Sequence, residues 1–132
     1  MNTETKRRST WQQAAIREAL GEVGTFISAQ QLFHRMADEG SSVSVATIYR
    51  SLARLAEDGQ ADVHLDPDGQ QLFRACDTAH HHHHLICREC GATVEISADP
   101  VERWARETAA EHGYVAESHV IDIIGLCPDC AR

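Results

Sequence analysis

Nonpolar side chains recur at helical spacing along the first part of the chain. Residues 11–20 form one such block, which should end before Gly21. A second helix is expected after Ser28, because Ser28 and Gln31 make a capping box, and it should end near Gly40. The stripe expected to face the core in the first helix consists of Trp11, Ala15, Ile16, Ala19 and Leu20.

A third helix and a strand hairpin should follow. The helix begins after Ser44, a favourable N-cap residue, and runs to about Glu57. Two short runs, 61–65 and 71–75, predict strands, and Asp-Pro-Asp-Gly at 66–69 is a strong turn signal between them. Three helices followed by a two-stranded ribbon predict a winged helix-turn-helix domain.

The exposed face of the third helix combines cations with small polar groups, as a helix in the DNA major groove requires. Arg50 offers a bidentate fork for guanine or phosphate, and Tyr49 offers a hydroxyl for phosphate. Arg50 and Arg54 also fit an ordinary solvated helix face, and winged helices serve as protein-binding modules too. The candidate DNA contacts are Thr47, Tyr49, Arg50 and Arg54.

Composition and charge narrow the class of protein. The 132 residues are 42% hydrophobic and 24% charged, which is typical of a soluble folded protein. A membrane-spanning run and a secretory signal are both missing, so we expect a cytoplasmic protein without a membrane partner. The net charge is −8, but residues 1–75 carry 8 basic and 10 acidic side chains, against 4 and 10 in residues 76–132. Any DNA-binding surface therefore belongs to the first half.

The second half contains all five cysteines and seven of the nine histidines. Cys87 with Cys90 and Cys127 with Cys130 form two C-x-x-C pairs, separated by 36 residues. Each pair can place two thiolates on one edge of a tetrahedral ion, so the two pairs predict a closed, structural four-cysteine zinc site. One pair alone would also fit a redox motif. The odd number of cysteines argues against a disulfide framework.

A run of five histidines, 80–84, lies between Cys76 and the first cysteine pair. Its internal position argues against an affinity tag. Where the run is extended, successive side chains face opposite ways, so it offers two separate metal sites that each need further ligands. Cys76 and Asp62 are available for one of them, and a thiolate with a carboxylate and two imidazoles suits Zn²⁺ better than Mn²⁺ or Mg²⁺. The two histidine pairs are His82 with His84 and His81 with His83.

The last part of the chain predicts a helix and a strand. Asp99 is the expected N-cap, and Glu102 fits either a capping box or a metal ligand. The helix should end at Gly113, and a strand should cover residues 114–124 and include His119, which fits either a structural residue or a ligand. The stripe that this helix should bury consists of Val101, Trp104, Ala105, Thr108 and Ala109.

Together these motifs resemble the Fur family of metalloregulators and, within it, the actinobacterial zinc uptake regulators. The resemblance rests on the segment 44–52, Ser-Val-Ala-Thr-Ile-Tyr-Arg-Ser-Leu, on Cys76, on the histidine run and on the two C-x-x-C pairs. It implies a homodimeric, zinc-dependent transcriptional repressor of α+β fold, which binds double-stranded operator DNA and takes no small-molecule substrate. The implied parts are a winged-helix domain 1–76, a hinge 77–80 and an α/β metal-binding dimerisation domain 81–132.

The resemblance also implies how the metal ligands divide among three sites. One Zn²⁺ is structural and one or two are regulatory, with the sensing site bridging the two domains across the hinge. Tyr49 and Arg50 match recognition-helix contacts of the family. The implied ligands are Cys87, Cys90, Cys127 and Cys130 for structural zinc, Asp62, Cys76, His82 and His84 for sensing zinc, and His81, His83, Glu102 and His119 for auxiliary zinc.

The same residues argue against an enzyme. A catalytic zinc site is open, with three protein ligands and a water, whereas each ligand set in this chain has four members. The sequence also shows no nucleophile motif, so we expect no enzyme. Sensors of iron, manganese, nickel or peroxide are nearer alternatives, and Cys76 favours zinc. Two features depart from the family pattern. Residues 10–13 lack the usual basic side chains, which residues 6–8 could replace, and the spacer 77–79 before the histidines varies in length among relatives. His80 has no assigned role.

Overall fold

The computed structural model describes residues 3–76, 82–116 and 118–132, and the side chains from residue 10 onward. The chain divides into two compact units, Met1–Ala79 and His80–Arg132, which are described separately below. The predicted hinge 77–80 and the ligand His81 lie outside the described residues, so the predicted domain boundaries stay a prediction. Among the described residues, no helix is both long and nonpolar enough to cross a membrane.

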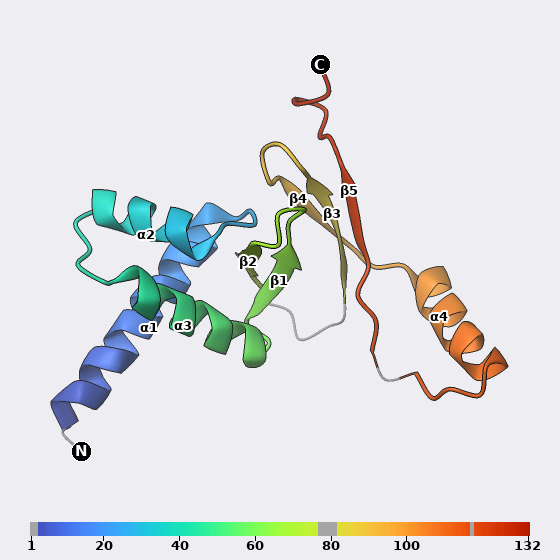
Figure 1. Cartoon of the computed structure of the whole chain (residues 1–132), viewed down its shortest axis with the longest axis horizontal. Helices are drawn as coiled ribbons and strands as arrows, with labels where there is room; N and C mark the ends of the chain where they lie inside the picture. Colours follow the sequence, from blue (N-terminus) through green and yellow to red (C-terminus); the bar gives the residue numbers. More distant parts are fainter. Residues whose placement is uncertain (1–2, 77–81, 117) are drawn as a thin grey trace. The chain divides into compact units, whose positions relative to one another are not determined.

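The first unit is three helices followed by a two-stranded ribbon, as predicted (Figure 1). The strands pair antiparallel with Ala61 opposite Ala75 and Leu65 opposite Gln71. The Asp66 carboxylate accepts hydrogen bonds from the backbone N–H groups of Asp68 and Gln70, which fixes the turn between them. The elements are α1 (Thr3–Val23), α2 (Ala29–Asp38), α3 (Val45–Glu57), β1 (Ala61–Leu65) and β2 (Gln71–Ala75).

The predicted caps position the second and third helices. Ser28 Oγ accepts from the N–H of Gln31, and the Gln31 side chain accepts from the N–H of Ser28, so the capping box is complete. Ser44 Oγ accepts from the N–H of Thr47 at the start of α3. Caps of this kind contribute roughly 1 kcal/mol each. They therefore fix where α3 begins and which residues it presents at its first turn.

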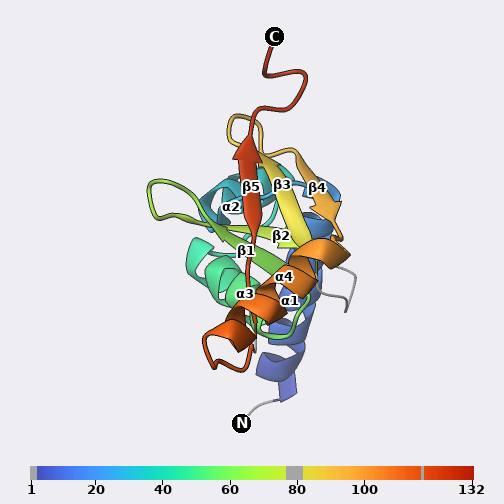
Figure 2. The same cartoon turned by 90° about the vertical axis from the view of Figure 1, so that its right-hand side faces the viewer.

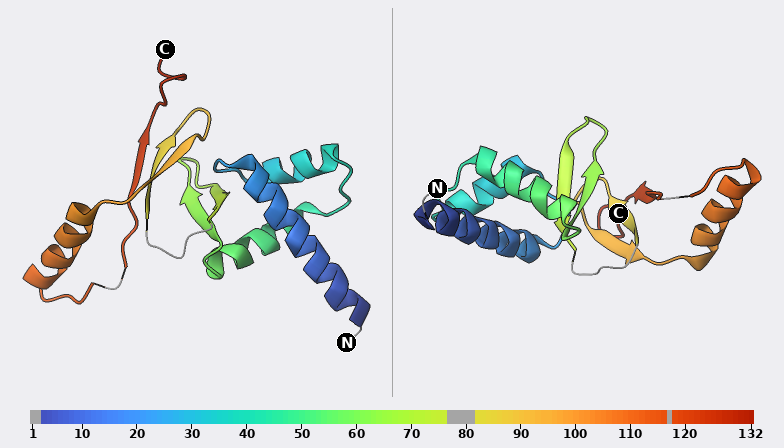
Figure 3. Two further views of the ribbon diagram at one scale, coloured as in Figure 1. Left: turned by 180° about the vertical axis from the view of Figure 1, so that it is seen from behind. Right: turned by 90° about the horizontal axis from the view of Figure 1, so that it is seen from below.

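Helix α1 differs from the prediction at both ends. It starts at Thr3 and continues through Gly21 to Val23, because a glycine on an exposed helix face costs only about 1 kcal/mol. Trp11 was expected in the buried stripe but is 67% exposed. The reason is that the N-terminal part of α1 projects past α2 and α3, so only its later turns are covered (Figure 3).

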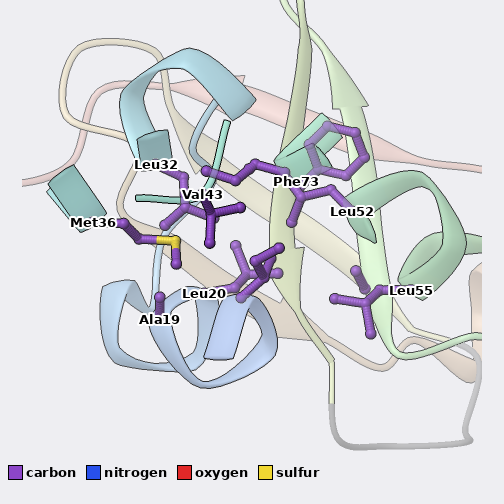
Figure 4. Packing of buried hydrophobic residues seen from close by; sticks show 11 residues of the cluster. Ala19, Leu20, Leu32, Met36, Val43, Leu52, Leu55 and Phe73 are labelled. Carbon is purple, nitrogen blue, oxygen red and sulfur yellow. The ribbon is translucent and has the colours of Figure 1, made fainter. Parts of the chain in front are cut away.

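One hydrophobic core holds the first unit together (Figure 4). It joins the later turns of α1 to α2, α3 and the ribbon, and each fully buried leucine or isoleucine contributes about 1.5–3 kcal/mol. The core fixes α3 with one face inward and the other in solvent. Its residues are Ile16, Ala19, Leu20, Leu32, Met36, Val43, Ile48, Leu52, Leu55, Ala61 and Phe73.

The second unit is a three-stranded sheet with one helix. The strand order is β4-β3-β5, with β3 antiparallel to β4 and parallel to β5 (Figure 2). Together with the helical first unit, this confirms the α+β class. The elements are β3 (His83–Cys87), β4 (Thr93–Ile96), α4 (Asp99–Glu111) and β5 (Asp122–Gly125).

Three predictions for this unit are wrong. The N-cap of α4 is Ala98 rather than Asp99, without a side-chain cap hydrogen bond. The strand predicted over 114–124 is confined to β5, because the pairing of this segment with β3 begins only at His84 opposite Asp122. The predicted stripe of α4 is not buried, because Trp104 is exposed and the other four stripe residues are only half-buried within the described chain.

Candidate metal centres and nucleic-acid interface

The four cysteines of the two C-x-x-C pairs meet at one point of the second unit. Their sulfur atoms all lie within 4.8 Å of one another, and none is in a disulfide. Cys90 Sγ and Cys127 Sγ are 3.7 Å apart. A tetrahedral zinc ion with Zn–S bonds of about 2.3 Å requires a sulfur–sulfur edge of about 3.8 Å. The residues present therefore fit a closed zinc site, and they were brought together as predicted.

Local backbone geometry forms the two knuckles of this site. Cys87 is the last residue of β3, and its carbonyl accepts from the N–H of Gly91, which has a φ of +78°. Such a conformation favours glycine, so Gly91 permits the tight turn after the first pair. In the second knuckle the Cys127 carbonyl accepts from the N–H of Cys130. The parallel pairing of β3 with β5, which ends at Cys87 opposite Gly125, brings the second knuckle beside the first.

The thiols of this cluster have unequal pKa values. The backbone N–H of Cys90, followed by that of Cys127, lowers the pKa of Cys87 to about 6. The Cys127 thiol raises the pKa of Cys130 to about 12. For Cys90, the backbone of Ala92 lowers the pKa, but the neighbouring thiols outweigh it and the pKa is raised. Cys87 is thus a thiolate at neutral pH, whereas zinc must displace protons from Cys90 and Cys130 when it binds.

A second cluster joins α4 to β3 and to the segment before β5. Glu102 lies between two imidazoles, with Oε1 2.6 Å from His83 Nε2 and Oε2 2.9 Å from His119 Nε2. The two rings stack with their centroids 5.1 Å apart. All three donor atoms lie within 4.8 Å of one another, which suits a metal ion. Glu102 is not a capping-box residue, because these contacts occupy its carboxylate.

The predicted alternation along the histidine run is present in β3. His83 faces Glu102, whereas His82 and His84 lie together with their ring centroids 4.9 Å apart. Two carboxylates flank this pair. Asp122 Oδ1 is 3.2 Å from His84 Nδ1, and Glu95 Oε1 is 4.0 Å from His82 Nε2.

The other two predicted sensing ligands belong to the first unit. Asp62 is half-buried on β1, and Cys76 is buried directly after β2. The Cys76 N–H donates to the Gln60 carbonyl, which continues the ladder by one residue. Asp62 lies two residues beyond Gln60, so Asp62 and Cys76 occupy the same face of the ribbon as diagonal neighbours. Both side chains therefore lie on one face of the ribbon.

The predicted DNA contacts all lie on α3. Thr47 Oγ1 accepts from the Ser44 hydroxyl at 3.0 Å and from Arg50 Nη2 at 3.3 Å, so the helix start holds the Arg50 guanidinium in place. Arg50 and Arg54 are both exposed. Tyr49 is 47% exposed. The structure thus presents two cations and a phenol at one helix surface.

The wing ribbon contributes to the same surface. The Tyr49 hydroxyl donates to Gln71 Oε1 at 2.9 Å, and the Tyr49 ring meets the buried Phe73 edge-on. Tyr49 and Gln71 border a groove of about 740 Å³ between α3, the start of α2 and the wing turn. Sequence reasoning missed Gln71 because the contact spans 22 residues. It also missed Asp122 and Glu95, because strand register decides that they flank the histidines.

Comparison with known proteins identifies the family. Residues 4–124 match the ferric uptake regulator family model. The chain belongs to this family. A zinc uptake regulation protein of Mycobacterium tuberculosis is 42% identical over 93% of this chain and 94% of its own length. The ferric uptake regulation protein of Escherichia coli is 36% identical over 78% of this chain and 69% of its own.

A solved structure extends the same relationship. The zinc uptake regulator FurB of Mycobacterium tuberculosis matches 98% of this chain and 99% of its own chain, with 40% identity and a TM-score of 0.60. Members of the family are transcription regulators, so the chain is a regulator rather than an enzyme. The four-cysteine cluster together with these zinc-regulator relatives makes it a zinc-binding protein.

Proposed function

We propose that the chain is a zinc-responsive repressor of genes for zinc uptake and homeostasis, which binds operator DNA as a homodimer when zinc fills a sensing site. The observation that carries this proposal is the 42% identity, over nearly the whole chain, to a zinc uptake regulation protein. It is supported by a buried thiol, Cys76, on the same face of the wing ribbon as the Asp62 carboxylate. We propose a cytoplasmic location, as operator binding requires.

The proposed sensing ligands combine hard and soft donors. Cys76 supplies a thiolate, Asp62 a carboxylate, and His82 and His84 two imidazoles. A thiolate selects Zn²⁺ over Mn²⁺ and Mg²⁺, which prefer oxygen donors. Bound zinc would supply only charge and coordination here, with no redox chemistry. The chain's own residues determine the selectivity.

The response follows from where these ligands lie in the chain. Asp62 and Cys76 belong to the DNA-binding unit, and His82 and His84 belong to the other unit. Ligation by all four would restrict the orientations that the DNA-binding unit can sample. A hundredfold gain in operator affinity requires a coupling free energy of about 2.7 kcal/mol. Zinc must bind the DNA-competent arrangement more tightly by that amount.

An auxiliary zinc site is proposed at the second cluster, with His83, Glu102 and His119 as ligands and His81 as the fourth. Its support is the short distances from Glu102 to both imidazoles. Because Glu102 belongs to α4, an ion at this site would fasten that helix to the sheet. With the four-cysteine site, this gives one structural and up to two regulatory ions per chain.

A homodimer is supported by the state of α4. This helix has 13 residues, and isolated helices of that length are marginally stable in water. None of its described residues is buried, and Trp104 is 63% exposed. A groove of about 600 Å³ runs along α4 and is lined largely by nonpolar side chains, including Trp104, Ala109 and Val115. A second copy would cover this surface.

The DNA interface is proposed on α3, with base and phosphate contacts from Thr47, Tyr49, Arg50 and Arg54. The first unit carries less excess negative charge than the second. The Arg50 fork is suited to guanine and to phosphate. In a homodimer, two such helices would enter successive major grooves on one side of the operator.

The test is operator binding as a function of free zinc, in the intact protein and in a Cys76→Ala variant. The variant should fold, retain its four-cysteine zinc and lose the zinc-dependent part of operator affinity. The substitution leaves the basic residues of the DNA-binding surface unchanged. Affinity for unrelated DNA should therefore be the same in both proteins, and it serves as the control. If the variant kept the same zinc dependence as the intact protein, the proposed sensing site would be wrong.

A metal other than zinc, such as iron, is the second candidate signal. A ferric uptake regulation protein is 36% identical to this chain, so membership of the family does not by itself specify the metal that is sensed. The experiment is to offer iron, manganese, nickel and zinc to protein stripped by mild chelation, and to measure metal content per chain. One retained zinc plus one or two that leave and return selectively supports a zinc sensor. Iron, manganese or nickel in the labile site would keep the regulator and change its signal.

A further inference from the structure

The imidazole of His84 is held by a carboxylate that none of the proposed ligand sets includes. Parallel pairing of β3 with β5 puts His84 directly opposite Asp122. Asp122 Oδ1 is 3.2 Å from His84 Nδ1. Both side chains are largely removed from solvent, with exposed fractions of 9% for His84 and 16% for Asp122. The pair therefore forms a buried polar contact within one rigid strand pair.

The chemistry of the contact assigns roles to the two ring nitrogens. An ionised carboxylate only accepts hydrogen bonds, so Nδ1 must carry the hydrogen and donate it to Asp122. In a neutral imidazole the lone pair then lies on Nε2, which becomes the nitrogen available to a metal. We propose that Asp122 is a positioning residue for the zinc ligand His84, fixing its ring and its tautomer. This inference rests on the proposed sensing function.

The neighbouring carboxylates have different geometries. Glu95 lies opposite His84 on the other flanking strand, but its oxygen is 4.0 Å from His82 Nε2, which is beyond hydrogen-bonding distance. Glu102 contacts the Nε2 atoms of two imidazoles at once, as a carboxylate in a ligand cluster does. Asp122 instead meets the Nδ1 atom of His84. In this arrangement a carboxylate accepts a hydrogen bond from the ring nitrogen that does not bind the metal, and so orients the histidine ligand.

The expected effect can be given as a change in zinc affinity. Losing a carboxylate that orients a metal-bound histidine typically weakens metal binding about 10–100-fold. Asp122→Ala removes both the acceptor and the charge, so it should show the full loss at the labile site. Asp122→Asn keeps an oxygen acceptor for Nδ1–H and should fall between the intact protein and Asp122→Ala. The four-cysteine zinc should be retained in both variants.

Zinc affinity of the labile site is measured by competition with a chromogenic chelator, with Glu95→Gln as the matched control. That variant removes one negative charge from the opposite flanking strand and leaves the contact of Asp122 with His84 in place. It should weaken zinc binding less than Asp122→Ala does, because only Asp122→Ala removes the acceptor for Nδ1–H. Equal losses in Glu95→Gln and Asp122→Ala would show that Asp122 acts only through its charge, and an unchanged affinity in Asp122→Ala would overturn the proposal.

Two spectroscopic measurements separate positioning from other roles. Long-range ¹H–¹⁵N correlation spectra of protein stripped of labile metal should show His84 protonated on Nδ1 in the intact protein and in Asp122→Asn, and a mixture of tautomers in Asp122→Ala. Co²⁺ bound in place of labile zinc should keep its thiolate-to-cobalt band and tetrahedral intensity in all three proteins. A changed coordination geometry in Asp122→Ala would make Asp122 a direct ligand and overturn the positioning role.

The same samples distinguish this inference from the proposed function. If zinc bound the labile site but did not change operator affinity, the regulatory proposal would be wrong. The order of zinc affinities among the Asp122 variants would still test the role of Asp122. If no labile zinc bound at all, the tautomer of His84 would still decide whether Asp122 sets the ring. An Nε2–H tautomer in the intact protein would refute the inference in either case.

Discussion

At the scale of single residues, Cys87 differs most from the other members of its cluster. It ends β3, and its side chain is only 4% exposed, whereas Cys90 is exposed. Backbone N–H groups of the two knuckles lower the pKa of Cys87 to about 6. The turn geometry that brings the sulfurs together therefore also prepares the first of them as a thiolate, which is the form that binds zinc.

This pKa predicts how the structural zinc responds to acid. A depressed pKa means that the thiolate of Cys87 is present at neutral pH and is lost as the pH falls through about 6. Protons and zinc compete for the same sulfur, so we expect zinc to stay bound at neutral pH and to be released only once the pH falls below about 6. Zinc release to a chromogenic chelator measures this.

The Cys76→Ala variant, treated by mild chelation to remove labile zinc, is the appropriate sample for this titration, because the four-cysteine zinc is then the ion observed. Circular dichroism on the same samples follows the fold. Loss of the structural zinc well above pH 6, with the fold intact, would contradict the role given to the Cys87 thiolate.

At the scale of elements, the structure shows which signals in the sequence were sufficient. The strands at 61–65 and 71–75 and the starts of α2 and α3 were predicted correctly, because caps and turn residues act within a few positions. Contacts between distant segments were not predictable in this way. The contact of Asp122 with His84 depends on parallel strand register, and the contact of Tyr49 with Gln71 spans the groove beside the wing.

Helix α4 shows what helical periodicity in a sequence cannot predict. Its nonpolar stripe at helical spacing predicts a buried face, yet Trp104 is 63% exposed in the described chain. Periodicity indicates that a face is covered but does not say by what. Here the covering surface is proposed to come from a second copy, which a single chain cannot display. The incorrect burial prediction is thus consistent with an element that completes its packing only in a dimer.

This argument predicts that Trp104→Glu prevents dimer formation. A charge placed in the nonpolar groove along α4 would have to be buried without a partner, which is strongly unfavourable. Sedimentation velocity should show a monomer. Trp11→Glu is the matched control, since Trp11 is 67% exposed on α1 and should leave the dimer intact. A stable dimer in Trp104→Glu would place the interface elsewhere.

At the scale of the whole molecule, the proposed sensing ligands are divided between the two units, and this division would make metal binding regulate DNA binding. The four-cysteine cluster draws all its ligands from the second unit, so an ion there can stabilise that unit without linking it to the other. Asp62 and Cys76, by contrast, are carried by the unit that holds α3. Zinc shared between these two residues and the pair His82 and His84, as proposed, would therefore be linked thermodynamically to DNA binding.

Linkage of this kind is reciprocal, which gives a test that does not depend on where zinc binds. If zinc tightens operator binding by a given factor, operator DNA must tighten zinc binding by the same factor. A hundredfold effect corresponds to about 2.7 kcal/mol in either direction. Zinc affinity of the labile site should be measured by chelator competition with operator duplex and with a scrambled duplex of equal length. An operator duplex that tightens zinc binding by the factor by which zinc tightens operator binding would establish that the two sites are coupled. An operator duplex that left zinc affinity unchanged would mean that the labile ion and the DNA-binding surface are not coupled.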